Sequence, residues 1–394
     1  MNRTNCLLCK GTKLFEFLDM GWSPHSDQFR QTRDEPEIHY PLRLMFCEDC
    51  GLVQLSYVVD RAELFTKDYL YESSITQTAR AHWRELATTA ISTVGLKPED
   101  RIVDIGSNDG TLLQEFKSRG FGHVVGVDPC PEVTEIARKN GIPTFTRFWE
   151  KGLIYGAKLI MGTNVFAHVS DYDAFMTAVV DSLREDGVFM FESPYLGDFL
   201  NGVEVDTVYH QHVTYLSLRP TVRFLATCGM EIFDIDFTPI HGGSFRCYCA
   251  RMGQRTVSKQ ARIAIASESI RKADLLLFAR QAALIRRDLM ALLWALKAEG
   301  KTIAAVSAPA KGMTLMNWCG INDSLIDFVT ERSKLKLGRY TPGSHIQIVG
   351  DEELVKRQPD YALLLAWNFS EEIMANNRGY RGKWIIPVPQ VRIV

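Results

Sequence analysis

Residues 103–111 read Val103-Asp104-Ile105-Gly106-Ser107-Asn108-Asp109-Gly110-Thr111. This stretch follows a short apolar run at 101–105 and leads into an amphipathic segment at 111–119. In α/β proteins, a glycine turn between a strand and a helix lets the backbone approach a ligand at the carboxyl end of the strand. The glycine spacing is GxxxG, which differs from the GxGxxG that cradles a dinucleotide pyrophosphate. The stretch therefore predicts an α/β domain with a ligand site at this turn.

Apolar runs and amphipathic segments continue to alternate after this turn. The next apolar runs lie at 124–127, 159–162 and 188–192, and the segments between them lie at 133–140 and 173–183. Short apolar runs are typical of buried strands, and the segments between them have the length of crossover helices. The pattern predicts a parallel sheet that is covered by helices on both faces.

The flanking parts of the chain have different compositions. Residues 257–299 are dense in Ala, Leu, Arg and Lys and contain no proline, which predicts one or two connecting helices. The first 70 residues are rich in turn formers, so we expect an irregular lobe that needs a metal to hold its shape. A second series of apolar runs predicts a second, smaller α/β domain, with strands at 301–306, 325–330, 346–349, 361–365 and 384–387.

Two CxxC pairs lie in the N-terminal lobe, Cys6 with Cys9 and Cys47 with Cys50. Two such pairs supply four thiolates, which can hold one Zn²⁺ at about 2.3 Å in a tetrahedral site without an open position. Redox dithiols and disulfides are the alternatives, but no thioredoxin-like βαβ pattern surrounds either pair and the chain has a cytosolic character. We therefore expect one structural zinc ion bound by all four cysteines.

The composition excludes several classes of partner. The 394 residues carry a formal net charge of −2, which offers no basic field for nucleic acid. The N-terminal residues MNRTNCLLCK lack the apolar core of a signal peptide, and apolar stretches such as 362–367 are too short to span a bilayer. We expect a cytoplasmic monomer that binds a small molecule and neither nucleic acid nor a membrane.

A histidine-rich segment offers candidate proton-transfer groups. Residues 208–216 read Val208-Tyr209-His210-Gln211-His212-Val213-Thr214-Tyr215-Leu216. In an extended chain, the two histidines share one face and Tyr209 shares the other with Gln211. A general base and its orienting partners could then meet at one pocket. A structural role for these residues, or a metal site at the HxH pair, is equally open at this point.

Two further segments offer candidate ligand contacts. Residues 240–246 combine two glycines with His241, Ser244 and Arg246, which fits a close approach to a ligand or a tight hairpin. Residues 307–312 join an expected strand to an expected helix, whose N-terminus could meet phosphate oxygens together with Lys311. Residues 331–340 add positive charge after another strand, as a ligand site or as a solvated basic loop.

The D-x-G-x-x-x-G form of residues 104–110 resembles the first motif of class I S-adenosylmethionine (SAM) methyltransferases. This resemblance implies a SAM site at Gly106, Asn108 and Gly110. Asp128, which follows the next apolar run, stands where that family has the acidic residue that accepts the ribose hydroxyls. Residues 162–169, which include Asn164, resemble the segment after the fourth strand of the same fold.

The order of motifs along the whole chain resembles the bacterial nucleotide-sugar 3-C-methyltransferases. The motifs are the two CxxC pairs, a Tyr-rich segment at 68–74, the D-x-G-x-x-x-G turn, Y-H-x-H-x-x-Y, H-G-G-S-x-R and the turn at 308–312. The resemblance implies that the chain transfers a methyl group from SAM to C3 of a 4-keto-6-deoxy sugar on a nucleoside diphosphate, through an enolate. The expected division is a zinc-binding lobe at 1–70, a SAM-binding methyltransferase domain at 71–255, connecting helices at 256–299 and a nucleotide-sugar-binding α/β domain at 300–394.

The same resemblance assigns roles to individual residues. The general base falls on His212, with Tyr209, His168 and one tyrosine of the Tyr69/Tyr71 pair, taken as Tyr71, beside the sugar. The expected substrate-binding residues are His241, Ser244, Arg246, Lys311, Arg332 and Arg339.

One position departs from the family pattern, which usually reads Y-H-E-H, because this chain has Gln211 in place of the glutamate. An amide does not accept a proton in acid–base catalysis, so we expect Gln211 to orient a neighbour. The alternative function is a zinc-bearing nucleotide- or SAM-binding protein without methyl transfer activity. A nucleic-acid methyltransferase is disfavoured because the expected basic patch is missing.

Overall fold

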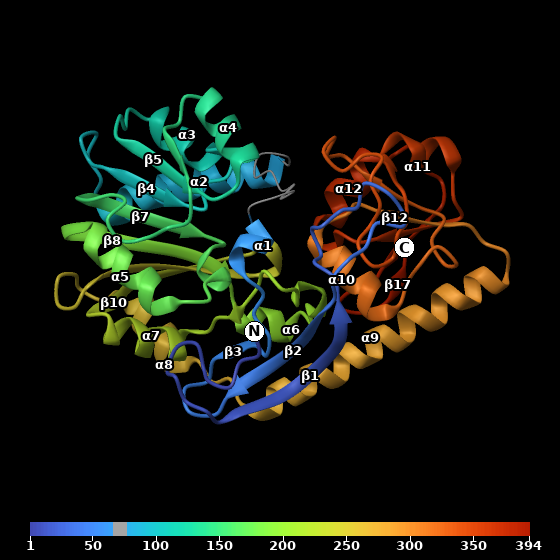
Figure 1. Cartoon of the computed structure of the whole chain (residues 1–394), viewed down its shortest axis with the longest axis horizontal. Coiled ribbons are helices and arrows are strands. Elements are labelled where there is room, and N and C mark those ends of the chain that lie inside the picture. The colour runs from blue at the N-terminus through green and yellow to red at the C-terminus, as the bar shows by residue number, and fades with distance from the viewer. Residues whose placement is uncertain (66–76) are drawn as a thin grey trace.

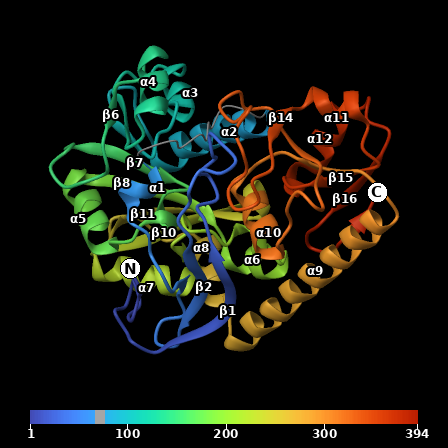
Figure 2. The same cartoon turned by 45° about the vertical axis from the view of Figure 1, so that its right-hand side comes forward.

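The computed structural model describes residues 1–65 and 77–394, which form three sheets and the helices around them. Figure 1 shows the seven-stranded sheet and the six-stranded sheet in two neighbouring bodies, with the strands β1 and β2 and the long helix α9 running below both. The view in Figure 2 places the two strands between the bodies. No helix of the described ranges combines the length and the apolar character that a bilayer span requires.

The N-terminal lobe is built on an antiparallel sheet of order β1-β2-β3-β9. Its elements are β1 (Leu14–Ser23), β2 (Tyr40–Cys47), β3 (Val53–Leu55), β9 (Thr214–Tyr215) and the short helix α1 (Arg61–Phe65). The expectation of an irregular lobe is therefore wrong. The pairing of β1 with β2 shifts register between Glu16 and Leu18, and such a bulge breaks the period-two alternation by which a strand is recognised in a sequence.

The central domain has a seven-stranded sheet of order β10-β11-β8-β7-β4-β5-β6. The parallel part of the sheet contains β4 (Ile102–Ile105), β5 (Val124–Asp128), β6 (Thr144–Thr146), β7 (Ala157–Thr163) and β8 (Leu183–Pro194). The four strands expected from the apolar runs, β4, β5, β7 and β8, are confirmed. The short strand β6 was not predicted, because only one of its three residues is apolar. All four residues of β4 are buried. Val103 and Ile105 pack into one hydrophobic cluster and Ile102 into another, because successive side chains of a strand point to opposite faces of the sheet.

Two antiparallel strands complete this sheet, β10 (Met230–Thr238) and β11 (Ser244–Arg251). The segment at 240–246 contains most of the turn between them and the first three residues of β11, so the hairpin alternative is confirmed there. The helices and 3-10 turns of the central domain are α2 (Gln77–Val94), α3 (Thr111–Lys117), α4 (Pro131–Lys139), η1 (Phe166–His168), α5 (Tyr172–Ser182), α6 (Leu196–Asn201), η2 (Val205–Thr207), α7 (Leu218–Thr227) and η3 (Ile240–Gly242).

The expected C-terminal α/β domain is confirmed and has a six-stranded sheet of order β14-β13-β12-β15-β16-β17. Five strands are parallel and β17 pairs with β16 in the antiparallel sense. The elements are β12 (Ile303–Val306), α10 (Ala310–Cys319), β13 (Phe328–Glu331), β14 (Ile348–Gly350), α11 (Glu352–Arg357), β15 (Tyr361–Leu364), η4 (Trp367–Phe369), α12 (Ser370–Asn376), β16 (Lys383–Ile386) and β17 (Arg392–Ile393).

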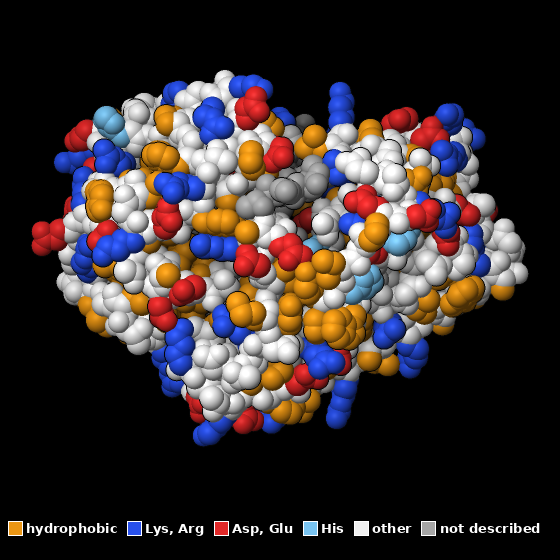
Figure 3. Space-filling model, viewed as in Figure 1, with side chains coloured by type: hydrophobic (Ala, Val, Ile, Leu, Met, Phe, Trp, Pro, Cys, Tyr) orange, Lys and Arg blue, Asp and Glu red, His pale blue; other side chains and the backbone are white. Residues whose placement is uncertain are grey.

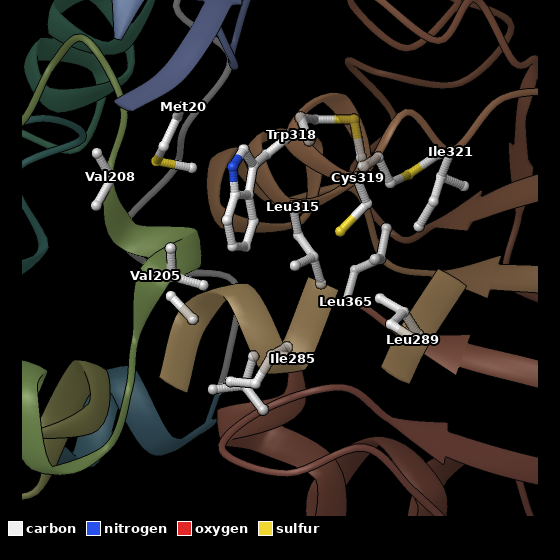
Figure 4. Packing of buried hydrophobic residues seen from close by; sticks show 14 of the residues in the cluster. Met20, Val205, Val208, Ile285, Leu289, Leu315, Trp318, Cys319, Ile321 and Leu365 are labelled. Atoms are coloured by element: carbon white, nitrogen blue, oxygen red, sulfur yellow. The ribbon is translucent and has the colours of Figure 1, made fainter. Parts of the chain in front are cut away.

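Two connecting helices, α8 (Lys259–Ser267) and α9 (Lys272–Ala298), join the two α/β domains, as expected. The inner side of α9 belongs to a hydrophobic cluster that also contains residues of the N-terminal lobe, the central domain and the C-terminal domain. Figure 4 shows this cluster, with Met20 of β1 and Val205 of η2 near Ile285 of α9 and Trp318 of α10. The three parts therefore share one core, which fixes their relative positions.

Candidate active site and zinc site

The four cysteines of the CxxC pairs come together where β2 ends. Their Sγ atoms all lie within 4.8 Å of one another, with 3.6 Å between Cys6 and Cys50 and 3.5 Å between Cys9 and Cys47. A tetrahedral Zn²⁺ with bonds of about 2.3 Å requires sulfur separations of about 3.8 Å. The four thiolates fit a zinc ion, and because all four positions are filled by protein the ion is structural.

A cavity of about 1160 Å³ lies where the three parts of the chain meet. It is lined by the turn after β4, by residues of the N-terminal lobe, by the turn after β12 and by Thr207, Tyr209, Gln211 and His212. Pockets for one drug-sized ligand measure about 300–1,000 Å³. The cavity is therefore large enough to hold two small molecules side by side.

Asp128 lies on the central-domain side of the cavity, as the last residue of β5. Its carboxylate accepts hydrogen bonds from the backbone N–H of Asn108 at 3.0 Å and of Cys130 at 2.9 Å. Burial raises the pKa of Asp128 to about 6, so the group is mostly ionised at neutral pH. A carboxylate offers about four lone-pair sites and two are used by the backbone, which leaves acceptors for ligand hydroxyls.

The turns after β4 and β7 complete this side. Gly106 has φ of 68°, and a Cβ atom there would lie 2.4 Å from the Val165 side chain, so the position requires glycine. Asp104 Oδ1 and Asn164 Oδ1 are buried, line the cavity and find no hydrogen-bond partner within the described ranges. Buried acceptors of this kind need donors. The ammonium group and hydroxyls of SAM are such donors, so the residues fit that cofactor.

Gly110 does not face the cavity. It caps α3 with φ of 81°, and a Cβ atom there would lie 3.1 Å from the Ile142 side chain and 3.2 Å from that of Ala137, so its observed role is close packing of the start of α3 against α4 and the loop after α4. Its expected contact with SAM stays a prediction.

His212 lines the cavity and is buried, and both of its ring nitrogens are engaged. Nδ1 is 3.0 Å from the carbonyl oxygen of Thr207, which can only accept, so Nδ1 carries the proton. Nε2 is then the unprotonated nitrogen, and it lies 2.9 Å from the Tyr209 hydroxyl, which donates to it. Burial, reinforced by nearby His168, holds the pKa of His212 well below its ordinary value of 6.5. The imidazole is therefore neutral and oriented as a base.

His168 stacks beside this dyad, with its ring centroid 5.2 Å from that of His212. Its Nε2 is buried and has no hydrogen-bond partner in the part of the chain that the structure describes. Burial lowers the pKa of His168 to about 4, so it too is neutral at pH 7. Tyr69 and Tyr71 lie outside the described residues, and their expected place beside the sugar stays a prediction.

Gln211 also lines the cavity and faces a residue of the N-terminal lobe. Its Nε2 donates to Asp27 Oδ2 at 3.2 Å, and Asp27 lines the same wall. Burial raises the pKa of Asp27, which nearby Lys336 partly offsets. A glutamate at position 211 would set two carboxyl groups against each other, whereas the amide donates a hydrogen bond to Asp27.

On the C-terminal side, Lys311 and His241 line the cavity. The Lys311 ammonium group lies 3.4 Å from Glu204 Oε2 and donates to the backbone oxygen of His241 at 3.2 Å. Burial raises the pKa of Glu204 to about 7, with Lys311 acting in the opposite direction. Burial lowers the pKa of His241 to about 4.

The other four expected substrate contacts do not line this cavity. Arg246 is buried between two carboxylates, 2.9 Å from Glu192 and 3.0 Å from Glu85, so its charge is satisfied inside the central domain. The Ser244 hydroxyl donates to the backbone oxygen of Ile240 at 3.1 Å. Arg332 lies 3.8 Å from Asp351 and Arg339 donates to the backbone oxygen of Phe29. Their expected roles in binding stay predictions.

Some residues of the cavity wall were not singled out from the sequence. Asp104 is part of the stretch at 103–111. The signal for it is a charged residue inside an otherwise apolar strand, β4, all of which is buried. Asp27 had no such signal, because it meets Gln211 across 184 residues of chain. Glu331 and Lys336 lie in the segment 331–340, where the positive charge drew attention away from the single residues. The signal for Glu331 is that it ends a strand, as Asp128 does.

Three family models match the chain in the order of its domains. A zinc binding domain matches residues 6–65, a methyltransferase domain matches residues 78–232 and a C-methyltransferase C-terminal domain matches residues 239–389. The curated relative C-methyltransferase NovU from Streptomyces niveus is 30% identical over 409 aligned positions, which cover 99% of this chain and 96% of that protein.

Solved structures with partial likeness include magnesium protoporphyrin IX methyltransferase (ChlM) from Synechocystis with bound SAH. It is 12% identical, covers 46% of this chain and 90% of its own, and has a TM-score of 0.37. A SAM-dependent methyltransferase from Clostridium acetobutylicum is 13% identical, covers 46% of this chain and 94% of its own, and also has a TM-score of 0.37.

The full-length relative and the three matched domains agree with the geometry of the two sites. The four clustered thiolates lie in the region matched as a zinc binding domain, and the Gly106 turn and Asp128 lie in the methyltransferase domain. The chain belongs to the family of SAM-dependent C-methyltransferases that carry an N-terminal zinc binding domain.

Proposed function

We propose that this C-methyltransferase transfers the methyl group of SAM to C3 of a nucleotide-linked 4-keto-6-deoxy sugar, through an enolate, in deoxysugar biosynthesis. The observation that carries the proposal is that neutral His212, the turn after β4 in the central domain and Lys311 of the C-terminal domain all line one cavity. A carbon acid bound between them would meet a base on one side and a methyl donor close by.

In the proposed reaction, the keto group acidifies the hydrogen on the neighbouring carbon, and His212 Nε2 removes it. The Tyr209 hydroxyl, which donates to that nitrogen at 2.9 Å before substrate binds, would turn to the enolate oxygen and leave the Nε2 lone pair free to take the proton. SAM, when bound, supplies an electrophilic methyl group to the enolate carbon. Thr207 holds the base through Nδ1 and keeps the correct tautomer during the proton transfer.

The C-terminal domain is proposed to bind the nucleotide part of the substrate. Its cavity wall includes Ser307, Lys311 and Lys336, so polar and cationic groups face the cavity where a diphosphate would lie. On the face in Figure 3, basic and acidic side chains are interspersed, which suits a small-molecule substrate better than a nucleic acid. We further propose that the enzyme acts as a cytoplasmic monomer.

The direct test is incubation with SAM and a panel of 4-keto-6-deoxy sugars on dTDP, GDP, CDP and UDP. We expect one sugar to gain a methyl group by mass, with the new carbon placed at C3 by NMR. Methylation at another carbon would contradict the assignment of C3 and would indicate a substrate whose keto group lies elsewhere on the sugar. Binding of SAM and a nucleotide sugar with no methyl gain across the panel would favour the alternative, a binding protein without transfer activity.

We expect Asp128→Asn to weaken SAM binding by about 1.5–3 kcal/mol, because the hydrogen bonds from ribose hydroxyls to a charged acceptor are lost. The pKa of about 6 adds a pH signature. In wild-type enzyme SAM affinity should fall as the pH drops below about 6, because the protonated carboxyl accepts fewer hydroxyls, and the variant should lack this dependence. Isothermal titration calorimetry between pH 5 and 8 measures both.

Asp104 titrates in the same site, but burial and the charge of Asp128 hold its pKa well above 3.8. Asp104→Asn is therefore the matched control, and it should keep the fall in affinity below about pH 6 that belongs to Asp128. Equal SAM affinity in Asp128→Asn and wild type would show that the ribose is held by other residues.

We expect Gln211→Glu to remain active and Gln211→Ala to lose only part of the rate, because the amide positions Asp27 and transfers no proton. The glutamate variant should lose activity above neutral pH, where both carboxyl groups ionise and repel each other. Steady-state kinetics across pH measures this. A loss in Gln211→Ala as deep as that of a deleted base would contradict the orienting role.

A further inference from the structure

The two α/β domains have the same arrangement of parallel strands. In the central domain the parallel order is β6-β5-β4-β7-β8, and in the C-terminal domain it is β14-β13-β12-β15-β16. In chain order both read third, second, first, fourth and fifth strand, so β4 corresponds to β12 and β5 corresponds to β13. In this architecture ligands bind outside the carboxyl ends of the strands, next to the first strand, where the strand order reverses.

The first turn of each domain has the same backbone form. Gly106 directly follows β4 with φ of 68°, and Ser307 directly follows β12 with φ of 71°. A left-handed conformation at a residue other than glycine is uncommon and costs about 1–3 kcal/mol. Ser307 holds it at the place where the SAM domain uses a glycine.

The second strand of each domain ends in an acidic residue with matching contacts. Asp128 ends β5, and its carboxylate accepts the backbone N–H of Asn108 from the first turn and of Cys130 two residues further on. Glu331 ends β13. Its carboxylate accepts the N–H of Ala308 from the first turn at 3.0 Å and of Ser333 two residues further on at 3.0 Å.

Both carboxylates line the same cavity, one from each domain. Glu331 Oε2 accepts only the Ala308 N–H among the hydrogen bonds found in the described ranges, and the nearest cation, Lys336 Nζ, is 3.8 Å away. Each carboxylate oxygen has two lone-pair sites, so Oε2 retains one acceptor position. The backbone contacts hold the carboxylate in place. The Glu331 side chain is only 13% exposed, so few other conformations are open to it.

We propose that Glu331 is a ligand-binding residue that accepts the ribose or deoxyribose hydroxyls of a nucleoside diphosphate in the C-terminal domain, as Asp128 does for SAM in the central domain. The inference rests on the proposed nucleotide-sugar substrate and deepens it. The cavity then holds two nucleoside ligands, each fixed by a carboxylate at the end of a second strand. Their reactive ends meet at the His212 dyad, which lies on the wall between them.

The test measures the coupling between Glu331 and the ligand hydroxyls. UDP, GDP, CDP, ADP and dTDP are titrated into the full-length enzyme in the presence of S-adenosylhomocysteine, and the best binder is compared with its 2′,3′-dideoxy counterpart. We expect wild-type enzyme to bind the hydroxyl-bearing form about tenfold to a hundredfold more tightly. In Glu331→Gln that ratio should fall to nearly one.

The ratio separates recognition from structure, because a turn disturbed by the loss of the Ala308 contact would weaken both ligand forms equally. Asp128→Asn is the matched control and should keep the wild-type ratio for the nucleotide while it weakens S-adenosylhomocysteine. An unchanged ratio in Glu331→Gln would overturn the assignment of Glu331 alone. Failure of wild-type enzyme to bind any of the five diphosphates would overturn the nucleotide-sugar substrate, and the inference with it.

Discussion

His212→Asn is expected to lose about 10²–10⁴ in turnover while it still binds SAM and the nucleotide sugar. The imidazole is buried and neutral, its Nδ1 proton is held by Thr207, and its Nε2 is free of a proton and faces Tyr209. An asparagine side chain can keep the hydrogen bond to Thr207 but cannot accept the proton. Single-turnover kinetics at saturating substrate isolates the chemical step.

Proton removal can be measured without methyl transfer. With S-adenosylhomocysteine in place of SAM, wild-type enzyme in D₂O should exchange the C3 hydrogen of the keto sugar, and His212→Asn should not. Because the pKa of His212 lies well below 6.5, the acid limb of exchange should also lie below pH 6.5. Tyr209→Phe keeps the base but removes the proposed donor to the enolate oxygen, so it should slow exchange without abolishing it.

Undiminished exchange in His212→Asn would show that another residue is the base. His168 is the next candidate, because its neutral ring lies 5.2 Å from that of His212 and its Nε2 is buried without a partner among the described residues. His168→Asn in the same assay distinguishes the two histidines, since only the variant that lacks the base should fail to exchange.

Local patterns predicted those parts of the protein that local interactions determine. The turn at Gly106 follows a wholly buried strand and caps a helix, so a few consecutive residues specify it. Each CxxC pair is also recognised from four consecutive residues. Only the meeting of the two pairs at one site depends on contacts between distant parts of the chain. The turn after β4 and the zinc site were therefore predictable from local sequence, whereas the contacts assigned there to SAM stay predictions.

Long-range partners decided what the sequence could not show. Arg246 follows a glycine pair that could have faced a ligand, but Glu192 and Glu85 meet it from two other elements and neutralise its charge. Asp27 has no motif around it and gains its place only by folding against Gln211. In both cases the chemistry of the residue is ordinary and its partner is distant, so periodicity and spacing carry no information about it.

The zinc lobe is connected by backbone pairing to the segment that carries His212, the proposed base. Strand β9, which begins two residues after His212, pairs with β3 of the lobe. The Thr214 hydroxyl in β9 lies 2.6 Å from the hydroxyl of Tyr172, and three of the four cysteines, Cys6, Cys47 and Cys50, pack in the same hydrophobic cluster as Tyr172. The lobe therefore holds the segment that carries the base, although the metal itself has no open position for substrate.

Removal of zinc is therefore expected to abolish turnover as well as lobe stability. Structural Zn²⁺ binding contributes about 10–16 kcal/mol in zinc-finger peptides, comparable with the whole unfolding free energy of a domain, about 5–15 kcal/mol. We expect one zinc per chain by elemental analysis. Cys47→Ser, or treatment with a strong chelator, should open residues 1–65 to proteolysis and hydrogen exchange, and should lower turnover far more than SAM affinity.

Cys228→Ser is the matched control, because Cys228 is a half-buried thiol outside the cluster of four. It should keep its zinc, its melting temperature and its activity. The comparison of turnover with SAM affinity tests the connection through β9, since the proposed SAM-binding turns belong to the central sheet and not to the sheet that contains β9. A chain that is purified in zinc-supplemented medium, contains no metal and melts at the same temperature with and without chelator would show that the four thiols need no ion. A metal-free chain that still exchanges the C3 hydrogen at the wild-type rate would show that the base keeps its position without the lobe.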